Sequence, residues 1–416
     1  MSKKNFLIFL AISFNSFPSA VAAPTVVQLK SNFQLQLTGG EQVSAMIFDA
    51  GNILITGTTD TRTSALVTGE LQGNSDGFLI SLTGSGQIQW STRLGNTADE
   101  MVTAIAQDSD GTYWVLGAAS TLTSKTGSTN TPSSAVLNPD NVVVDRSAVS
   151  NSAFNKVKIW QISKSGSILN SFESTQIPLI EPKQILIDAA NLIVVGNLYS
   201  QNQSQGFILN CTKTGVFQPI TKYGLKNTKF NAGNFDGQGN LLIVGSSGET
   251  IGKSKNVSTA DAVAIRISNV NSSPTIARAS LKNTTRSWSN LSSNLFISGW
   301  VNYSAKSKIK SEFAVTKFST FGKPIWSNRF AALKTGTSQS IGNSFWAAFS
   351  PTSNLSVVKG WQTKGSPGAV LKFDAKGKVI SAFQVAGNPI LSTANESNGL
   401  ILLTEAGNSL NFYNLK

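Results

Sequence analysis

The chain has 416 residues, of which only 13% are charged, and its formal net charge is +13. It contains no histidine, which excludes a Ser-His-Asp or Cys-His catalytic arrangement and any histidine-containing zinc site. The single cysteine, Cys211, excludes an intramolecular disulfide. The positive charge favours anionic partners, with simple solubility as the alternative.

The first part of the chain has the features of a secretory signal peptide. Lys3 and Lys4 form a positive start, residues 6–12 are apolar, and Ala20-Val21-Ala22 supplies small residues for cleavage. The apolar segment is too short to span a bilayer, although a retained anchor is the alternative. We therefore expect a signal peptide at residues 1–22 and a mature chain at 23–416. This chain would be secreted or at the cell surface, with no membrane span after cleavage.

A strand pattern repeats through the mature chain. It consists of Asn and Leu or Ile, three mostly apolar residues, and Gly, preceded by a polar turn. Four clear copies, two variants and one degenerate copy begin at Asn52, Asn191, Asn240, Asn294, Thr112, Asn354 and Gly399, respectively.

A second strand follows each copy and ends on an apolar residue that is preceded by a polar one. The seven apolar ends are Leu82, Ile162, Cys211, Ile267, Phe318, Phe373 and Leu415. This alternation predicts one side chain facing a core and its neighbour facing away. Five units have a turn glycine four residues later, and Asn271 takes that place in another.

These patterns predict units of four antiparallel strands, which we call a to d. Seven units leave about 56 residues for each, the length of a propeller blade with its loops. We therefore predict an all-β fold, a single seven-bladed β-propeller of four-stranded blades. Cys211 and the tryptophans Trp90, Trp160 and Trp326 are expected in the core, and the aspartates of the a–b turns are expected to bond local backbone.

One segment resembles a known repeat. Residues 76–82 (DGFLISL), followed by Gly84-Ser85-Gly86 and Trp90-Ser91-Thr92, are similar to the bacterial extracellular SBBP-type β-propeller repeat, and residues 318–326 are a second match. The resemblance implies a propeller fold and a secreted or surface location. It supplies no catalytic motif that could be transferred to this chain.

The two ends of the chain are predicted to close the ring. The last unit stops after strand c at Leu415, so it lacks a strand d. The segment from Phe33 to Thr38 looks like a strand d without a unit of its own. We expect this N-terminal strand to complete the C-terminal blade, which would remove exposed sheet edges.

The b–c connections and the a–b and c–d turns should lie on opposite faces of the ring. The turns are short, whereas the b–c connections are long, at residues 58–75, about 118–155, 246–260 and 300–311. Long loops on a rigid scaffold commonly carry binding residues, so the b–c face is the expected functional face. For residues 118–155, a tolerated insertion is the alternative.

Two neighbouring b–c connections are basic and have aromatic residues beside them. Lysines could supply charge and aromatics could supply stacking surface for an anionic polymer, whereas solvated lysine-rich loops are the alternative. The predicted ligand-binding residues are Lys253, Lys255, Lys306, Lys308, Lys310, Trp300 and Tyr303.

The sequence therefore favours a monomeric, non-catalytic binding or scaffolding propeller. Its ligand would be an anionic surface polymer or an extracellular protein, with nucleic acid less favoured. The alternative is a secreted lyase or glycosidase with paired carboxylates at the central channel, and so whether the chain is an enzyme stays open. No catalytic residue, metal site or cofactor is predicted.

Overall fold

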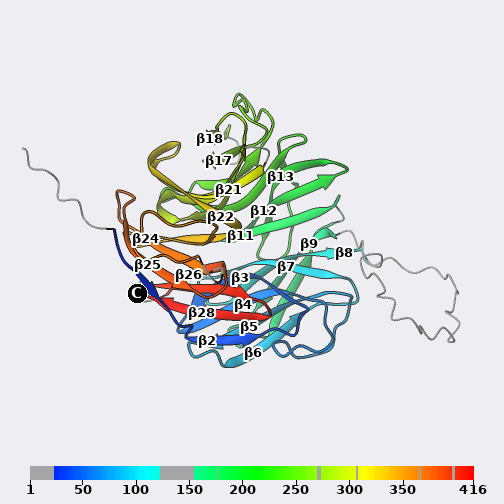
Figure 1. The fold of residues 1–416 in the computed structure, drawn as a ribbon. Coiled ribbons are helices and arrows are strands. Elements are labelled where there is room, and N and C mark those ends of the chain that lie inside the picture. Colours follow the sequence, from blue (N-terminus) through cyan, green and yellow to red (C-terminus); the bar gives the residue numbers. More distant parts are fainter. Residues whose placement is uncertain are drawn as a thin grey trace, which may run out of the picture.

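The computed structural model of the chain describes residues 23–121, 154–175, 177–268, 273–305, 308–363, 365, 367–395 and 399–416. The predicted signal peptide, most of the predicted long loop and Lys306 lie outside these ranges. The described residues form an all-β propeller in which the sheets follow one another in chain order (Figure 1). No helix within these ranges has the length and apolar character needed to cross a bilayer.

Five blades are separate four-stranded sheets. Blade 1 consists of β3 (Glu41–Asp49), β4 (Asn52–Thr59), β5 (Asp76–Thr83) and β6 (Ile88–Leu94). Blade 2 consists of β7 (Glu100–Gln107), β8 (Tyr113–Ser120), β9 (Phe154–Ile162) and β10 (Ile168–Glu173). Blade 3 consists of β11 (Ile180–Asp188), β12 (Asn191–Ser200), β13 (Gln203–Thr212) and β14 (Thr221–Tyr223). Blade 4 consists of β15 (Thr228–Phe235), β16 (Leu241–Ser247), β17 (Asp261–Ile267) and β18 (Thr275–Ala279). The closing blade consists of β26 (Asn388–Ala394), β27 (Leu400–Ala406), β28 (Ser409–Leu415) and β2 (Phe33–Gln36).

The sixth sheet has eight strands, and we call it the wide sheet. It contains β19 (Thr284–Ser292), β20 (Phe296–Ala305), β21 (Lys308–Thr320), β22 (Lys323–Ile341), β23 (Ser344–Pro351), β24 (Gly368–Phe373), β25 (Val379–Val385) and β1 (Val26–Gln28). A short 3-10 turn, η2 (Ser293–Leu295), separates β19 from β20.

The prediction of seven separate four-stranded blades is therefore wrong: the structure has five such blades and the wide sheet. The difference arises in β22, which continues for 19 residues without a turn. Its first part pairs with β21 and its second part pairs with β23, with a register shift between Ala332 and Gly336. Hydrogen bonding therefore runs through β22 where a break between two blades was expected.

The predicted closure of the ring is confirmed. β2 pairs antiparallel with β28, from Phe33 opposite Phe412 to Gln36 opposite Ser409, and these blue and red strands lie side by side in Figure 1. The rings of Phe33 and Phe412 stack with their centroids 4.3 Å apart. The N-terminal segment also makes a contact that was not predicted, because β1 pairs in parallel with β25 at the outer edge of the wide sheet.

The alternation at the end of each strand c is largely reproduced. Five of the seven predicted inward residues are buried, whereas Ile267 and Phe318 are partly buried. Cys211 is one of the buried five, and burial raises the pKa of its thiol to about 11, so it behaves as a small apolar residue.

The c–d turn glycines hold neighbouring sheets together on the face opposite the b–c loops. Gly166 has a φ of +87°, and a Cβ added there would lie 2.5 Å from the ring of Trp90 on the preceding blade. Gly86 lies against Phe33 in the same way, so β2 packs on blade 1 as an ordinary outer strand would. Trp160 is buried as expected, whereas Trp90 at the Gly166 contact and Trp326 beside Gly377 within the wide sheet are partly buried.

Candidate functional site

The central channel has a largely uncharged lining. The cavity has a volume of about 570 Å³ and is lined by the inner strands β3, β7, β11, β15, β19, β22 and β26. Among the described residues that line it, Lys183 is the one charged side chain and none is acidic. A carboxylate pair for glycoside cleavage is therefore not placed at the channel by the described residues.

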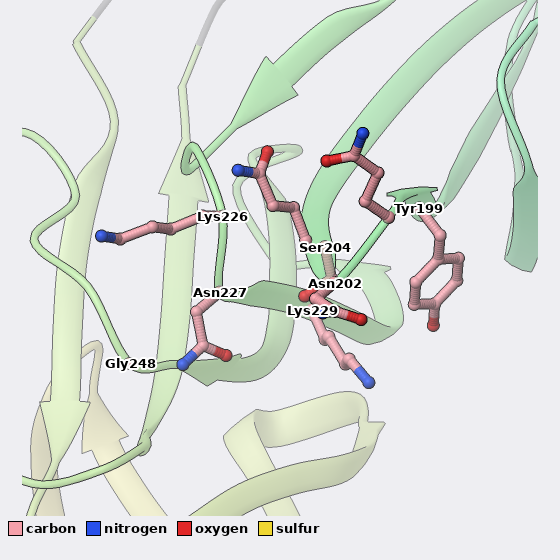
Figure 2. A pocket seen from close by; sticks show the side chains of 9 residues that line it. Tyr199, Asn202, Ser204, Lys226, Asn227, Lys229 and Gly248 are labelled. Atoms are coloured by element: carbon pink, nitrogen blue, oxygen red, sulfur yellow. The ribbon is translucent and has the colours of Figure 1, made fainter.

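A second cavity opens on the b–c face between blades 3 and 4 (Figure 2). It has a volume of about 570 Å³, and its lining includes the amides of Gln201, Asn202, Gln203 and Asn227. Two lysines also line the cavity and extend in different directions in Figure 2; they are Lys226 and Lys229.

Two sets of contacts support this cavity. The Lys229 ammonium lies 5.4 Å from the centroid of the Tyr199 ring, whose hydroxyl donates to Glu181 Oε2 at 2.6 Å. Beneath the cavity, Glu249 accepts from the backbone NH groups of Leu225, Lys226 and Asn227. Burial alone would raise the pKa of Glu249, but these NH groups and the Thr228 hydroxyl hold it below its ordinary value. Glu249 is therefore a structural anion that orders the rim.

The structure places most of the predicted lysines on this same face. Lys253 and Lys255 are exposed in the loop between β16 and β17, the same loop that contributes Gly248 to the cavity of Figure 2. Lys308 and Lys310 are exposed at the start of β21. Residues 300–311 were predicted as a loop, but most of them extend β20 and β21, with Tyr303 opposite Lys310. The lysines therefore stand on a hairpin rather than on a loop.

The two predicted aromatic residues do not form an open stacking surface. Trp300 is partly buried and packs in the core of the wide sheet, with its ring centroid 5.1 Å from that of Phe313. Tyr303 is also partly buried, and its hydroxyl donates to Glu312 Oε1 at 3.1 Å.

Three charged side chains of the wide sheet face blade 4 at its b–c end, and we call them the arginine seam: Arg286, Glu312 and Arg329. Arg286 and Glu312 both lie opposite Val301 in the strand register, so their side chains point to the same side of the sheet. Arg329 shares that side because it lies two residues before Ala331, the partner of Glu312.

The charges of the arginine seam are unbalanced. Arg329 Nε lies 3.4 Å from Glu312 Oε2, whereas Arg286 Nε has no hydrogen-bond partner in the described part of the chain. Burial and the charge of Arg329 lower the pKa of Arg286, and Glu312 and Asp261 act in the opposite direction. Two guanidinium groups therefore share one carboxylate of their own sheet.

Blade 2 carries the reverse arrangement towards blade 1, and we call it the glutamate seam: Glu100, Lys156, Lys158 and Glu173. Both lysines pair with Glu173, Lys156 at 3.0 Å and Lys158 at a shorter distance. Glu100 is fully buried, and its Oε1 has no hydrogen-bond partner in the described ranges. Burial raises the pKa of Glu100 to about 8, and Lys158 opposes that effect.

Both seams are built on one backbone frame. The NH of Glu100 donates to Ser75 O at 2.8 Å, and the NH of Arg286 donates to Ala260 O at 2.9 Å. The residue after each acceptor is a buried aspartate paired with an arginine of strand d. These pairs are Asp76 with Arg93 at 3.4 Å and Asp261 with Arg278 at 3.5 Å. Glu100 and Arg286 therefore occupy equivalent positions in their sheets.

Sequence reasoning missed Arg286, Arg329, Lys226 and Lys229. A signal for Arg286 was present, because the glycine of each b-strand repeat sets the register of the strand a that pairs with it. The strand-a residues opposite the second residue after that glycine are Glu41, Glu100, Ile180, Thr228 and Arg286. Lys229 follows Thr228 on β15, whereas Lys226 lies in a connection and Arg329 lies on a strand whose register the repeat does not fix.

The described residues hold no group of three or more acidic or thiol side chains placed to bind a metal ion. Two of the a–b turn aspartates bond local backbone, as expected: Asp236 accepts from the NH groups of Gln238 and Asn240, and Asp108 accepts from the NH of Ser109. Asp49 instead accepts from the Tyr113 hydroxyl of the next blade. A third cavity of about 1210 Å³ lies on the b–c face near blades 1 and 2, with Asp60, Arg62 and Asp99 in its lining.

Comparison with known proteins supports the fold and no more specific assignment. No family model and no curated protein match the chain. Among solved structures, Drosophila Plexin A in complex with Semaphorin 1b has a TM-score of 0.50 and 9% identity, covering 94% of this chain and 88% of that one. BamB from Moraxella catarrhalis has a TM-score of 0.42 and 12% identity, covering 94% and 100%. The β-propeller domain of the Trilobed protease from Pyrococcus furiosus has a TM-score of 0.47 and 8% identity, covering 91% and 96%. The chain is thus a β-propeller, whereas the SBBP-type resemblance has no support from a family model.

Proposed function

We propose that the chain is an exported, non-catalytic binding propeller that takes an anionic polymer on its b–c face. The observation that carries this proposal is the concentration of exposed lysines there, on blade 4 and the adjoining wide sheet: Lys226, Lys229, Lys253, Lys255, Lys308 and Lys310. The largely uncharged channel offers no comparable feature. Cations grouped on one face attract a polyanion over a distance set by ionic strength.

The resemblance of residues 76–92 to SBBP-type repeats and the signal-peptide features of residues 1–22 support a secreted or cell-surface location. An acidic surface polysaccharide or wall polymer would be the ligand encountered there. Membership of the SBBP-type family is part of this proposal.

The test replaces the five predicted lysines, Lys253, Lys255, Lys306, Lys308 and Lys310, with alanine. At low salt, we expect the Kd of this variant for polygalacturonate or dextran sulfate to be at least about tenfold higher than that of the wild type. Its Kd should also rise less steeply with salt concentration. The matched control replaces five lysines of the other face and the chain ends: Lys30, Lys164, Lys323, Lys376 and Lys416. Equal binding by both variants would refute the proposal.

A protein partner is the second candidate, because large apolar side chains stand beside the lysines. Leu225, Val257 and Ile309 are 76%, 63% and 80% exposed. Exposed apolar groups rimmed by charge are typical of protein interfaces. Replacing these three residues with serine should leave polymer binding intact and should abolish protein binding. Loss of polymer binding in the serine variant would instead assign them to the polymer site.

A further inference from the structure

The arginine seam has more positive charge than its own sheet neutralises. Glu312 Oε1 accepts from Tyr303, and its Oε2 lies 3.4 Å from Arg329 Nε without forming a hydrogen bond. The Oδ2 of the other nearby carboxylate, Asp261, lies 3.5 Å from Arg278 and accepts from the NH of Val257 at 2.8 Å, whereas its Oδ1 has no hydrogen-bond partner among the described residues. Three arginines thus share two carboxylates, and among the described residues Arg286 makes no ion pair within 4 Å and its Nε makes no hydrogen bond.

The seam is open to a ligand from the b–c face. The Arg329 side chain is 43% exposed, and Arg286 is partly buried beside it. Lys308 and Lys310 alternate with Glu312 along β21 and so lie on the same side of the sheet. Across the seam, the loop that carries Lys253 and Lys255 is tied to β19 through the bond from Arg286 NH to Ala260 O.

Arginine and lysine contribute differently to binding an anion. The guanidinium is a planar fork that bonds two oxygens of a carboxylate or sulfate, whereas an ammonium acts as a mobile point charge. Partial burial strengthens such bonds because the local dielectric constant is lower than that of water. We propose that Arg286 and Arg329 form an oxyanion subsite that holds one carboxylate or sulfate group of the polymer, an inference that rests on the proposed function.

The test separates geometry from charge. Arg286→Lys keeps the positive charge but removes the fork, so we expect affinity of the full chain for dextran sulfate and polygalacturonate to fall about tenfold, with an unchanged salt slope. The matched control is Arg266→Lys, which makes the same change on the opposite face, where Arg266 pairs with Asp236 at 3.0 Å. It should bind as the wild type does, and neutral dextran should bind to none of them.

The two polymers distinguish the sources of the oxyanion. Weakening of both by Arg286→Lys indicates a general oxyanion subsite, and weakening of one identifies sulfate or carboxylate as its preferred group. If Arg286→Lys binds both polymers as the wild type does while the five-lysine variant has lost them, the subsite is refuted and the proposed function stands.

If neither polymer binds the wild type, these polymers fail as ligands of the proposed function and the subsite is tested with sodium sulfate alone. At constant ionic strength, sulfate should raise the melting temperature of the wild type and of Arg266→Lys more than that of Arg286→Gln. Equal increases in all three would refute the subsite. Circular dichroism spectra that match the wild type ensure that each variant is folded.

Discussion

The glutamate seam and the arginine seam place opposite charges on the same backbone frame. In both, strand a of one sheet donates its NH to the residue before a buried Asp–Arg pair of the preceding blade. Blade 2 then presents a Glu, two Lys and a Glu from its strands a, c and d, whereas the wide sheet presents Arg, Glu and Arg. The repeat fixes the positions of these side chains, and the individual sequence sets the sign of the charge at each seam.

The largest expected effect comes from reversing the charge at one of the two equivalent positions. Arg286→Glu would put a third carboxylate beside Asp261 and Glu312 in a partly buried seam. We expect it to lower the free energy of unfolding by about 3–4 kcal/mol, measured by urea denaturation. Arg286→Gln, which removes the charge without reversing it, should cost less than half as much. A cost below about 1 kcal/mol for the glutamate variant would show that the seam is not electrostatically constrained.

The next largest effect on stability is expected on the opposite face, at the c–d turn glycines of the same two pairs of sheets. Gly166 and Gly322 have φ values of +87° and +82°, so alanine is equally strained by the backbone at both. A Cβ at Gly166 would lie 2.5 Å from the Trp90 ring, whereas a Cβ at Gly322 would lie 3.4 Å from Ala277. We expect Gly166→Ala to cost about 3 kcal/mol and Gly322→Ala about 1 kcal/mol, in the same denaturation assay. Equal costs would mean that Trp90 does not lock blade 1 onto blade 2.

A third prediction uses the pH dependence of the glutamate seam. The folded pKa of Glu100, about 8, exceeds its ordinary value of 4.5, so the folded state holds a proton that the unfolded state releases between these values. Its contribution to stability is therefore fully present below pH 4.5 and is lost as the pH rises to about 8. We expect Glu100→Gln to be about 2 kcal/mol more stable than the wild type at pH 8.

At pH 4 the two proteins should have similar stability. Urea denaturation at both pH values checks this, and Glu173→Gln, which affects a partly exposed carboxylate held by two lysines, is the control. If the stability advantage of Glu100→Gln is the same at both pH values, burial does not hold the proton on Glu100.

The smallest effect is expected at the exposed end of the arginine seam. The Arg329 side chain is 43% exposed, so its pair with Glu312 is screened by water. Arg329→Gln should change the free energy of unfolding by about 0.5 kcal/mol or less. A cost as large as that of Arg286→Glu would show that Arg329, and not Arg286, carries the electrostatics of the seam.

Several features of the fold followed from local signals in the sequence. Apolar and polar residues alternate along each strand c, and turn glycines follow at a fixed distance, which located most hairpins. The missing strand d of the last unit predicted that the segment from Phe33 to Thr38 completes that blade, and β2 does pair with β28.

Other features depend on contacts that local patterns do not encode. The wide sheet arises because β22 continues as a strand through Gly336, close to where it changes partner from β21 to β23. A glycine at such a position commonly marks a turn, so nothing in the sequence indicated that the strand would continue. Residues 300–311 are polar and were predicted as a loop, but each strand of that hairpin satisfies the other's backbone groups. The lysines could be picked out from the composition of their segments. Arg286 could not, because its role depends on the charges of Asp261 and Arg329, which lie near it only in the folded chain.

The pairing of β2 with β28 has a consequence for how this protein is made. The hydrogen bond from Gln34 to Asn411 joins residues 377 positions apart. A ribosome synthesises β2 long before β28, so the closing blade cannot form until β28 has been made. The ring stays open until then, and β2 remains available to wrong partners. A chain of this design needs its early strands kept apart from other chains until β28, Ser409–Leu415, is in place.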